Sequence, residues 1–526
     1  MAKTGIFREE PKRSTSRRRL TIVILLAVVV VGAMGLELTC RALYYQRHAG
    51  EPIAIVKAVK SLLRDDSHDV IEPPAAGRWF LTSTREDAED LTEEQRREII
   101  RLNSIGYLPG SQPPLDARNV TVNERDFAFD GLNLVVSGHA SEAILVDMNG
   151  RELHKWQCDK NRAFPDLGEE LRTNHQYTCW RRAHLMPNGD MLAIFGGLGI
   201  VKLDKDSNVI WSKRNNAHHD VHVASDGRIY LLGRAAHVNK RYHDSEPVLE
   251  DYLVVLDPDG RELERFSLFD ALADSPFAAH MRRGHKSGDI FHTNTIELIE
   301  GPVPEDSSLR SGTVLISIRE LDLLCAVDTQ QKQVYWAEAG LWHRQHQSTL
   351  LPDGRIMLFD NKGVDRQSRV LEFNPVTRRV DWMYGDEQHP FFSPTCGSAQ
   401  RLPNGNTLIT ESDPGRAFEV TPDQKIVWEY VSPYRAGEEE EFVATLFEIV
   451  RIPRQYTTAW LSQTGDMIQL TAATKCIADP IEHEHTDAAD PVVVPASSHA
   501  EGHTRIDASD AAGDVIHSIT LATPAL

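Results

Sequence analysis

The sequence predicts an all-β fold, a six-bladed β-propeller preceded by an N-terminal transmembrane helix and a helical neck. Three observations support this prediction. A basic segment followed by an apolar run opens the chain, a hairpin unit recurs four times, and an aromatic position recurs six times. Two hairpins per repeat give a four-stranded sheet, and a period of about fifty residues is typical of a propeller blade.

The N-terminal segment predicts membrane attachment. Basic residues between Lys12 and Arg19 precede a nearly unbroken apolar run from Leu20 to Leu36. Such a run is either a signal anchor or a cleaved signal peptide, and its length favours an uncleaved anchor over residues 20–40. The positive-inside rule then leaves residues 1–19 in the cytoplasm. We therefore expect a single-pass protein of the inner (cytoplasmic) membrane, with the propeller on the periplasmic or extracellular side.

Residues 41–128 are predicted to form a helical neck or linker. The run from Leu91 to Leu102 carries a capping box, Thr92 with Gln95, and a charged exposed face. No residue pattern in this region indicates catalysis.

Residues 129–455 carry the repeats that predict the propeller. One hairpin unit is an apolar strand, a Pro-Asn-Gly or Asp-Gly turn, and a second apolar strand; such turns are the strongest short-range hairpin signal. Its copies occupy residues 184–195, 223–232, 350–359 and 401–410. A second hairpin ends in an aromatic residue: Trp156, Trp211, Phe266, Trp336, Trp382 and Trp428. Six aromatic positions predict six blades.

The two ends of the repeat region are predicted to close the ring. The first repeat, starting at Gly131, has only three strands, and Val443–Ile452 can supply the missing innermost strand and remove an exposed edge. Residues 456–526 are rich in Ala, Asp, Ser and His, and we expect a disordered low-complexity tail. His483 and His485 in this tail could bind a metal ion, although a solvated tail is the favoured interpretation.

The charge of the chain narrows the possible binding partners, and two of its cysteines suggest a possible disulfide. The formal net charge of -20 argues against a nucleic-acid partner, because phosphates would be repelled. Cys158 and Cys179 flank a polar insertion, and a tentative disulfide between them would staple a loop that has no core of its own. The alternative is two free thiols.

The repeat register brings several polar side chains to the central channel, which the first strand of each blade lines. His219 lies eight residues before the turn glycine Gly227, and His346 lies eight residues before Gly354. Equal offsets predict that both histidines lie at one height in the channel. The same offset in the second blade holds Arg181, which is therefore a candidate substrate-binding residue.

The fourth blade adds three candidates. His292 and Asn294 begin its inner strand, and Arg319 lies on the next strand. Next to His219, His218 is a second substrate-binding candidate. It could instead bind metal with His222, because strand alternation places both on one face. No Cys or Glu completes a usual ligand set, so we predict neither a metal nor a cofactor.

The region from Asp130 to about Arg451 resembles the bacterial arylsulfotransferases, also called aryl-sulfate sulfotransferases. The matching segments are 131–139 (Gly-Leu-Asn-Leu-Val-Val-Ser-Gly-His), 216–220 (Asn-Ala-His-His-Asp), His292-Thr293-Asn294 with Ser317-Ile318-Arg319, and Gln345-His346 with 358–361 (Leu-Phe-Asp-Asn). These motifs are far more specific than a generic propeller repeat.

The resemblance implies a six-bladed propeller that moves a sulfuryl group from a phenolic sulfate ester to a phenol through a sulfo-histidine, without a nucleotide sulfate donor. It implies that His346 is the nucleophile. The remaining site residues would bind the sulfuryl oxygens and handle the acceptor proton: His219, His292, Asn294 and Arg319.

The chemistry is consistent with this implication. A neutral imidazole is a competent nucleophile at neutral pH, and fixed cations stabilise the charge that spreads over the sulfuryl oxygens. The chain has no Gly-x-x-x-x-Gly-Lys loop for a nucleotide and no Cys/Ser-x-Pro-x-Arg run of the sulfatase kind. The alternative from a different class is a non-enzymatic envelope propeller that binds a ligand or a partner protein.

Overall fold

The computed structural model describes residues 73–81, 117–363, 367–438, 440–456 and 458–461. They all belong to the second of two compact units, which begins at Pro73. The predicted anchor at 20–40 and the histidines of the tail lie outside the described residues, so both remain predictions. Within the described ranges, no helix has the length and apolar character needed to cross a bilayer.

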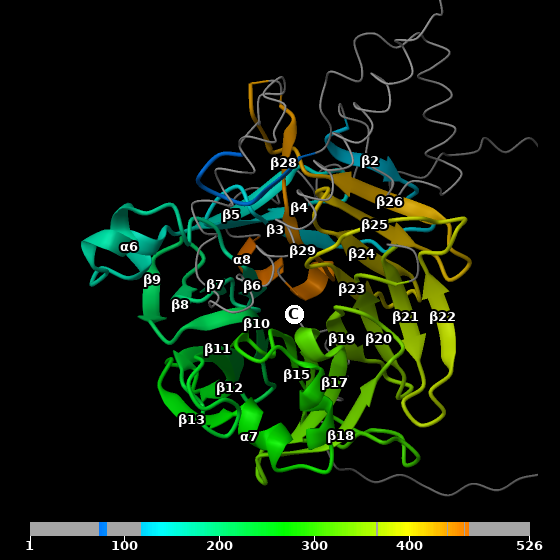
Figure 1. Ribbon diagram of the computed structural model, residues 1–526. Helices are drawn as coiled ribbons and strands as arrows, with labels where there is room; N and C mark the ends of the chain where they lie inside the picture. The colour runs from blue at the N-terminus through cyan, green and yellow to red at the C-terminus, as the bar shows by residue number, and fades with distance from the viewer. Residues whose placement is uncertain (1–72, 82–116, 364–366, 439, 457, 462–526) are drawn as a thin grey trace, which may run out of the picture. The chain divides into compact units, whose positions relative to one another are not determined.

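Six four-stranded antiparallel sheets form the blades (Figure 1). The first blade contains β29 (Leu446–Ile452), β3 (Leu132–Ser137), β4 (Glu142–Val146) and β5 (Glu152–Gln157). The second contains β6 (Arg182–Leu185), β7 (Met191–Phe195), β8 (Gly199–Leu203) and β9 (Val209–Lys213). The third contains β10 (Ala217–Val223), β11 (Ile229–His237), β12 (Val248–Leu256) and β13 (Glu262–Ser267), with β14 (Gly288–Asp289) parallel to β12.

The fourth blade contains β15 (Thr293–Leu298), β16 (Val314–Ile318), β17 (Leu323–Asp328) and β18 (Gln333–Ala339). The fifth contains β19 (His346–Leu350), β20 (Ile356–Asp360), β21 (Arg369–Phe373) and β22 (Val380–Tyr384). The sixth contains β23 (Ser398–Arg401), β24 (Thr407–Glu411), β25 (Arg416–Val420) and β26 (Ile426–Val431), with β2 (Asn119–Asn123) added at the outer edge. Strands of successive blades pack against each other around the whole ring, including the sixth against the first. The all-β propeller expected from the repeats is therefore confirmed.

The recurring turn and aromatic positions have structural roles. The four turn glycines, Gly189, Gly227, Gly354 and Gly405, have φ between 83° and 89°, a conformation that glycine adopts without strain. All six predicted aromatic residues lie on the fourth strand of their blade. Four of their indole nitrogens donate to a turn carbonyl of the next blade, as Trp156 does to Gly189 at 3.0 Å and Trp428 to Met148 at 3.0 Å. These bonds fasten neighbouring blades together.

The ring closes through the predicted C-terminal segment, with one correction to its limits. Strand β29 pairs with β3, so Leu446–Ile452 supplies the innermost strand of the first blade. The preceding residues instead form β28 (Phe442–Ala444), which pairs with β1 (Trp79–Leu81) and β27 (Arg435–Ala436). The first blade thus joins both ends of the repeat region in one sheet.

Polar side chains of one blade bind the free edge of the next blade's inner strand. Asp220 accepts a hydrogen bond from the Ile296 amide at 3.0 Å, and Glu297 accepts one from the Leu350 amide at 3.0 Å. Without such partners the inner-strand amides would be buried and unpaired, which costs about 1–3 kcal/mol each. The channel walls are therefore polar for structural as well as chemical reasons.

Glu297 should make the protein less stable as the pH rises. Its burial raises its pKa from 4.5 to about 8, so the native state keeps a proton that the unfolded chain has released. Stability from this group is complete below pH 4.5 and is lost as the pH approaches 8, by up to about 1.4 kcal/mol per pH unit. Glu297→Gln keeps the acceptor for Leu350 and removes the titration. Melting temperatures of variant and wild type should diverge with rising pH; parallel profiles would contradict this prediction.

The predicted helical neck is wrong for the residues of that region that the structure describes. There the chain forms the strands β1 and β2, because their backbones pair with β28 and β26 at the ends of the repeat region. The predicted helix at 91–102 lies outside the described residues. The predicted tail also begins later than expected: after η4 (Arg454–Tyr456), α8 (Thr458–Leu461) brings Trp460 onto Trp156 at a ring distance of 5.5 Å.

The tentative disulfide is also wrong, because Cys158 and Cys179 are free thiols. The insertion between them packs onto the core of the blades and has no separate core. It contains α5 (Lys160–Ala163) and α6 (Glu169–Thr173), and its Phe164 joins the apolar core of the first two blades. Trp180 donates from its indole nitrogen to the Cys158 carbonyl at 3.2 Å, so this contact fastens the two ends. The remaining helices are α7 (Leu268–Ala273), η1 (Ala278–Arg283) and η2 (Arg319–Leu321).

Candidate active site

His346 is held so that one of its ring nitrogens is free to react. It begins β19, and its Nδ1 lies 2.6 Å from Asn361 Oδ1 and 3.1 Å from the Arg344 carbonyl. The Asn361 amide nitrogen donates to the carbonyls of Ser393 and Cys396, which fixes its oxygen towards the imidazole. Both partners of Nδ1 are acceptors, so Nδ1 carries the hydrogen. The lone pair of the neutral ring is therefore on Nε2.

The surroundings keep this imidazole neutral. Burial, followed by the positive charge of Arg181, lowers the pKa of His346 well below 6.5, and the hydrogen bond with Asn361 only partly opposes the shift. The residue is 4% exposed. At neutral pH His346 is thus an unprotonated imidazole beside a fixed cation, the state that nucleophilic attack requires.

His219 and His292 lie together in the neighbouring blades. Their rings pack edge to face at 4.6 Å, and His292 Nδ1 donates to Asp289 at 2.5 Å. Burial and then the charges of His292 and Arg181 lower the pKa of His219 well below 6.5. His346 also contributes to that shift, as expected if the predicted histidines share one end of the channel.

The backbone is strained where these histidines meet the channel. His219 has φ 56°, His292 has φ 50°, and Gln347, next to His346, has φ 44°. Each position lies at or beside an irregularity in the pairing of the blade's inner strand, as at a β-bulge. In a regular strand these side chains would point between the blades, and the irregularity turns them towards the channel. Such backbone strain clusters at functional sites.

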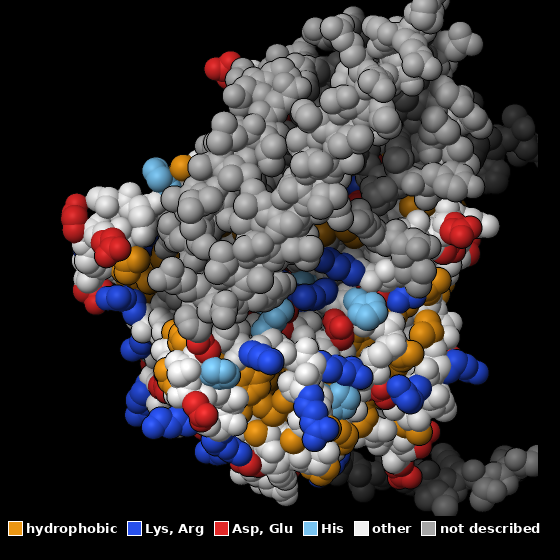
Figure 2. Space-filling view, viewed as in Figure 1, with side chains coloured by type: hydrophobic (Ala, Val, Ile, Leu, Met, Phe, Trp, Pro, Cys, Tyr) orange, Lys and Arg blue, Asp and Glu red, His pale blue; other side chains and the backbone are white. Residues whose placement is uncertain are grey.

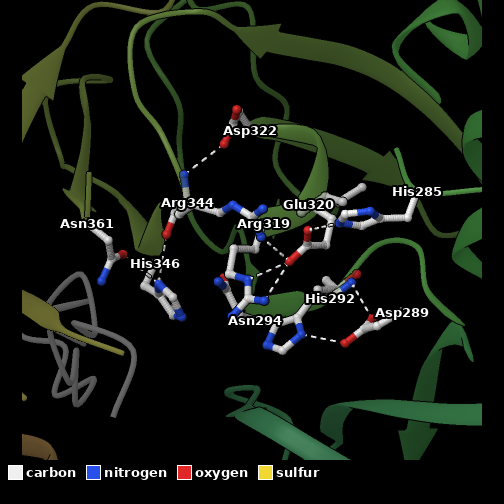
Figure 3. A network of polar contacts seen from close by, with 12 residues as sticks. His285, Asp289, His292, Asn294, Arg319, Glu320, Asp322, Arg344, His346 and Asn361 are labelled. Atoms are coloured by element: carbon white, nitrogen blue, oxygen red, sulfur yellow. Dashed lines mark hydrogen bonds and ion pairs between the residues drawn. The ribbon is translucent and has the colours of Figure 1, made fainter. Parts of the chain in front are cut away.

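Contrary to the expectation from the sequence, Arg319 is not a free cation, because its guanidinium is paired with the carboxylate of Glu320. Figure 3 shows Arg319 and Arg344 converging on Glu320, with His285 on its other side. Arg319 Nη2 lies 2.5 Å and His285 Nε2 lies 2.8 Å from this carboxylate, which is 4% exposed. Arg319 also lies in the turn η2 rather than on β16. This cluster of three cationic groups on one acid borders the His346 site.

Arg181 is the less neutralised guanidinium. It lies over the ring of Phe447 at 5.1 Å, and within the described part of the chain it forms no ion pair. Its charge is the second-largest cause of the lowered His346 pKa, after burial. The position predicted from the blade register therefore supplies an available positive charge at the site.

Asn294 and His218 are more deeply embedded than the sequence indicated. Asn294 donates from Nδ2 to the Gln345 carbonyl at 2.8 Å, which ties the fourth blade to the residue before His346. His218 is 1% exposed and contacts Asp251 and His219 rather than the channel opening. Both can position the reacting groups.

Sequence reasoning gave no role to several residues of this site: Asn361, Arg344, Glu320, His285, Asp289 and Asp251. Only Asn361 could have been identified from the sequence, since it ends the segment 358–361 that resembles the arylsulfotransferases. The others are charged residues beside turns or on second and third strands. Nothing in the repeat register predicts where such side chains point.

The mouth of the site is cationic on an acidic protein. In Figure 2, Lys, Arg and His side chains gather around the hollow near the middle of the face shown, with acidic side chains among them. The formal net charge of the chain is -20, so this is a local reversal of sign. Such a mouth attracts anions and discourages binding of cations.

The described residues contain no group of three or more His, Cys, Asp or Glu side chains able to hold a metal ion. His218 and His222 do not share a site, since a register shift separates them along β10. His218 Nε2 lies 3.4 Å from Asp251, whereas His222 Nε2 lies 3.7 Å from Glu300.

Comparisons with solved structures return distant matches. A protein of unknown function from Bacteroides caccae is 11% identical, with a TM-score of 0.41 and coverage of 62% of this chain and 99% of that one. Streptogramin B lyase is 12% identical, with a TM-score of 0.35 and coverage of 64% and 87%. The WD40 propeller domain of Doa1 is 10% identical, with a TM-score of 0.34 and coverage of 63% and 95%. Likenesses this low carry no functional argument.

The sequence itself gives the more specific result. No curated protein matches the chain. Residues 182–433 match the family model described as arylsulfotransferase (ASST). This range contains the second to fifth blades, nearly all of the sixth, and every histidine of the site. The resemblance found from the motifs is confirmed over this range, because residues 182–433 match the arylsulfotransferase family model.

Proposed function

We propose that this protein transfers a sulfuryl group from a phenolic sulfate ester to a phenol, through a sulfo-histidine at His346 and without a nucleotide donor. One observation carries the proposal: Nδ1 of His346 is occupied by two acceptors, which leaves the Nε2 lone pair as a nucleophile in a cationic channel. The family match supports a sulfotransferase-like enzyme.

In the first half-reaction, the Nε2 lone pair attacks sulfur and the bond from sulfur to the aryl oxygen breaks. The phenolate leaves with that electron pair and takes up a proton. Negative charge spreads over the three sulfuryl oxygens as it does in phosphoryl transfer, and preorganised cations stabilise it. Arg181 is the main candidate for this role, with Arg319 assisting from its ion pair with Glu320.

In the second half-reaction, the oxygen of an acceptor phenol attacks the sulfur of sulfo-His346. The N–S bond breaks and its electron pair returns to Nε2. The acceptor proton must pass to a base, and His219 is neutral at neutral pH because its pKa is well below 6.5. His292 lies beside His219 and directs its Nδ1 hydrogen at Asp289, so Nε2 of the neutral ring can accept a hydrogen bond from the phenol hydroxyl.

We also propose that an uncleaved anchor at residues 20–40 holds the enzyme in the inner membrane, with the propeller on the periplasmic or extracellular side. The basic residues before the apolar run support this topology. Protease added to intact spheroplasts should then remove the propeller and leave a membrane-retained N-terminal fragment. A protected propeller would reverse the topology.

A chromogenic aryl sulfate, supplied with and without a second phenol, tests the reaction. A transferase releases its chromophore faster when phenol is added and forms the new sulfate ester in equal amount. A hydrolase releases chromophore at a rate that phenol does not change. A non-enzymatic propeller that only binds a ligand releases none, and either of these last two results would reject the proposal.

A further inference from the structure

We propose that His218 and Asp251 form a proton relay behind His219, so that His219 acts as an acid in one half-reaction and as a base in the other. This inference rests on the proposed sulfuryl transfer. The relay would make His218 a positioning residue for protons rather than a residue that binds substrate.

The three side chains form a line leading inwards from the channel. His219 Nδ1 lies 2.8 Å from His218 Nδ1, and His218 Nε2 lies 3.4 Å from Asp251 Oδ1. His218 and Asp251 are each 1% exposed, whereas His219 is partly open to the channel. The other oxygen of Asp251 accepts a hydrogen bond from the Thr293 amide at 2.7 Å, which fixes the carboxylate in place.

The contact between the two imidazoles allows only certain proton arrangements. Two ring nitrogens at hydrogen-bonding distance share one hydrogen, because both cannot donate and two lone pairs would repel. Among the described residues His218 Nε2 has no hydrogen-bond partner, but the Asp251 carboxylate, which can only accept, lies 3.4 Å away, so the proposal places a hydrogen on Nε2. The shared hydrogen therefore belongs either to His219 Nδ1 or to His218 Nδ1.

These two arrangements give His219 opposite chemical roles. When the shared hydrogen is on His219, the neutral ring has its lone pair on Nε2 and is a base. When it is on His218, that ring is an imidazolium paired with Asp251, and His219 carries its hydrogen on Nε2 and is an acid. The acid form becomes the base form when His219 Nε2 gives up its proton and the shared proton moves across 2.8 Å from His218 to His219, and the reverse steps restore it.

The double displacement uses both forms in turn. In the first half-reaction, His219 gives its Nε2 proton to the leaving phenolate and takes the shared proton onto Nδ1, so the His218 imidazolium becomes neutral. In the second, the acceptor phenol gives its proton to His219 Nε2, and the Nδ1 proton returns to His218. The pair ends each full cycle as it began, with one net proton moved from acceptor to leaving phenol.

The geometry also explains why a buried ion pair would be retained behind the site. Burial, followed by the charges of His292, Arg181, His218 and His346, opposes a positive charge on His219, as its lowered pKa indicates. The carboxylate of Asp251 lies instead beside His218, 3.4 Å from its Nε2. The stored proton is thus kept one residue away from the cations that bind the sulfuryl group.

The test is the burst of phenol release in His218→Gln, measured without acceptor on two donors. Glutamine keeps a hydrogen-bond donor for Asp251 but cannot pass a proton. With 4-nitrophenyl sulfate, whose phenolate needs no protonation, the burst rate should stay within about threefold of wild type, and with phenyl sulfate it should fall about 10²-fold, the usual scale of general acid catalysis. Asp251→Asn, which removes the counter-ion, should show the same dependence on the donor.

His222→Gln is the matched control, because it makes the same change at another buried histidine of β10 that touches Glu300 instead. It should leave the ratio of the two burst rates unchanged. If His218→Gln and Asp251→Asn slow both donors equally, or neither, the relay is rejected. If wild type gives no burst with either donor, the proposed function fails instead. Should His218→Gln not fold, Asp251→Asn decides the question alone.

Discussion

His346→Ala should abolish the burst of phenol release and lower turnover on the order of 10⁶-fold, the scale seen when the nucleophile of a covalent mechanism is removed. Asn361 and the Arg344 carbonyl orient Nδ1 of this ring alone, and no other described imidazole has its reactive nitrogen set in this way beside Arg181. Rapid-quench measurements with an aryl sulfate and no acceptor report the burst directly.

His343→Ala is the matched control for this substitution. His343 lies three residues earlier, its side chain is 65% exposed, and it contacts Asp322 rather than the channel. We expect a normal burst from this variant. If His346→Ala keeps a stoichiometric burst, another residue carries the sulfuryl group.

Arg181→Ala should reduce turnover by about 10²–10³-fold, the cost of losing one preorganised donor to the developing charge. Arg319→Ala should cost less, because Glu320 already takes up part of the charge of Arg319. The comparison uses kcat for one donor at saturating phenol, with melting temperatures to confirm that both variants fold.

Which of the two variants loses more kcat decides which arginine binds the sulfuryl oxygens. The family resemblance assigned that role to Arg319 and left Arg181 as a secondary candidate. A larger loss with Arg319→Ala would show that Glu320 releases Arg319 when substrate binds, and it would contradict the main charge-stabilising role of Arg181. Arg344 remains on Glu320 in both variants.

The repeating parts of the fold could be predicted because each has a local signal. A turn such as Asn404-Gly405 needs a positive φ, and an aromatic residue such as Trp428 recurs where neighbouring blades are fastened. The neck could not be predicted from local pattern. The strand β1 exists because it pairs with β28, from the other end of the repeat region.

The site was predictable to the extent that it follows blade register. That register brought His219, His346 and Arg181 to one end of the channel, and the inner strand of the fourth blade added His292. Register could not show the irregularities that turn His219 towards the channel while His218 faces Asp251. These depend on backbone strain and on contacts with other strands.

The contacts that assign chemical roles to the side chains could not be predicted from the sequence either. Asn361 selects the tautomer of His346 only because its own amide is held by two carbonyls from the loop before the sixth blade. Glu320 moderates Arg319 only because the turn η2 places it between Arg319, Arg344 and His285. Residue types suggested the reaction, whereas tertiary contacts distribute the charges and protons.

Peptide mapping by mass spectrometry after rapid reaction with an aryl sulfate tests the central claim most directly. Because N-sulfonated imidazoles are labile in acid, the digest is kept at neutral to basic pH. We predict one added sulfuryl group per active site, on the peptide that contains His346, and its loss when a phenol is added. An adduct on His219 or His292, or a single sulfuryl group that phenol does not remove, would contradict the sulfo-His346 mechanism.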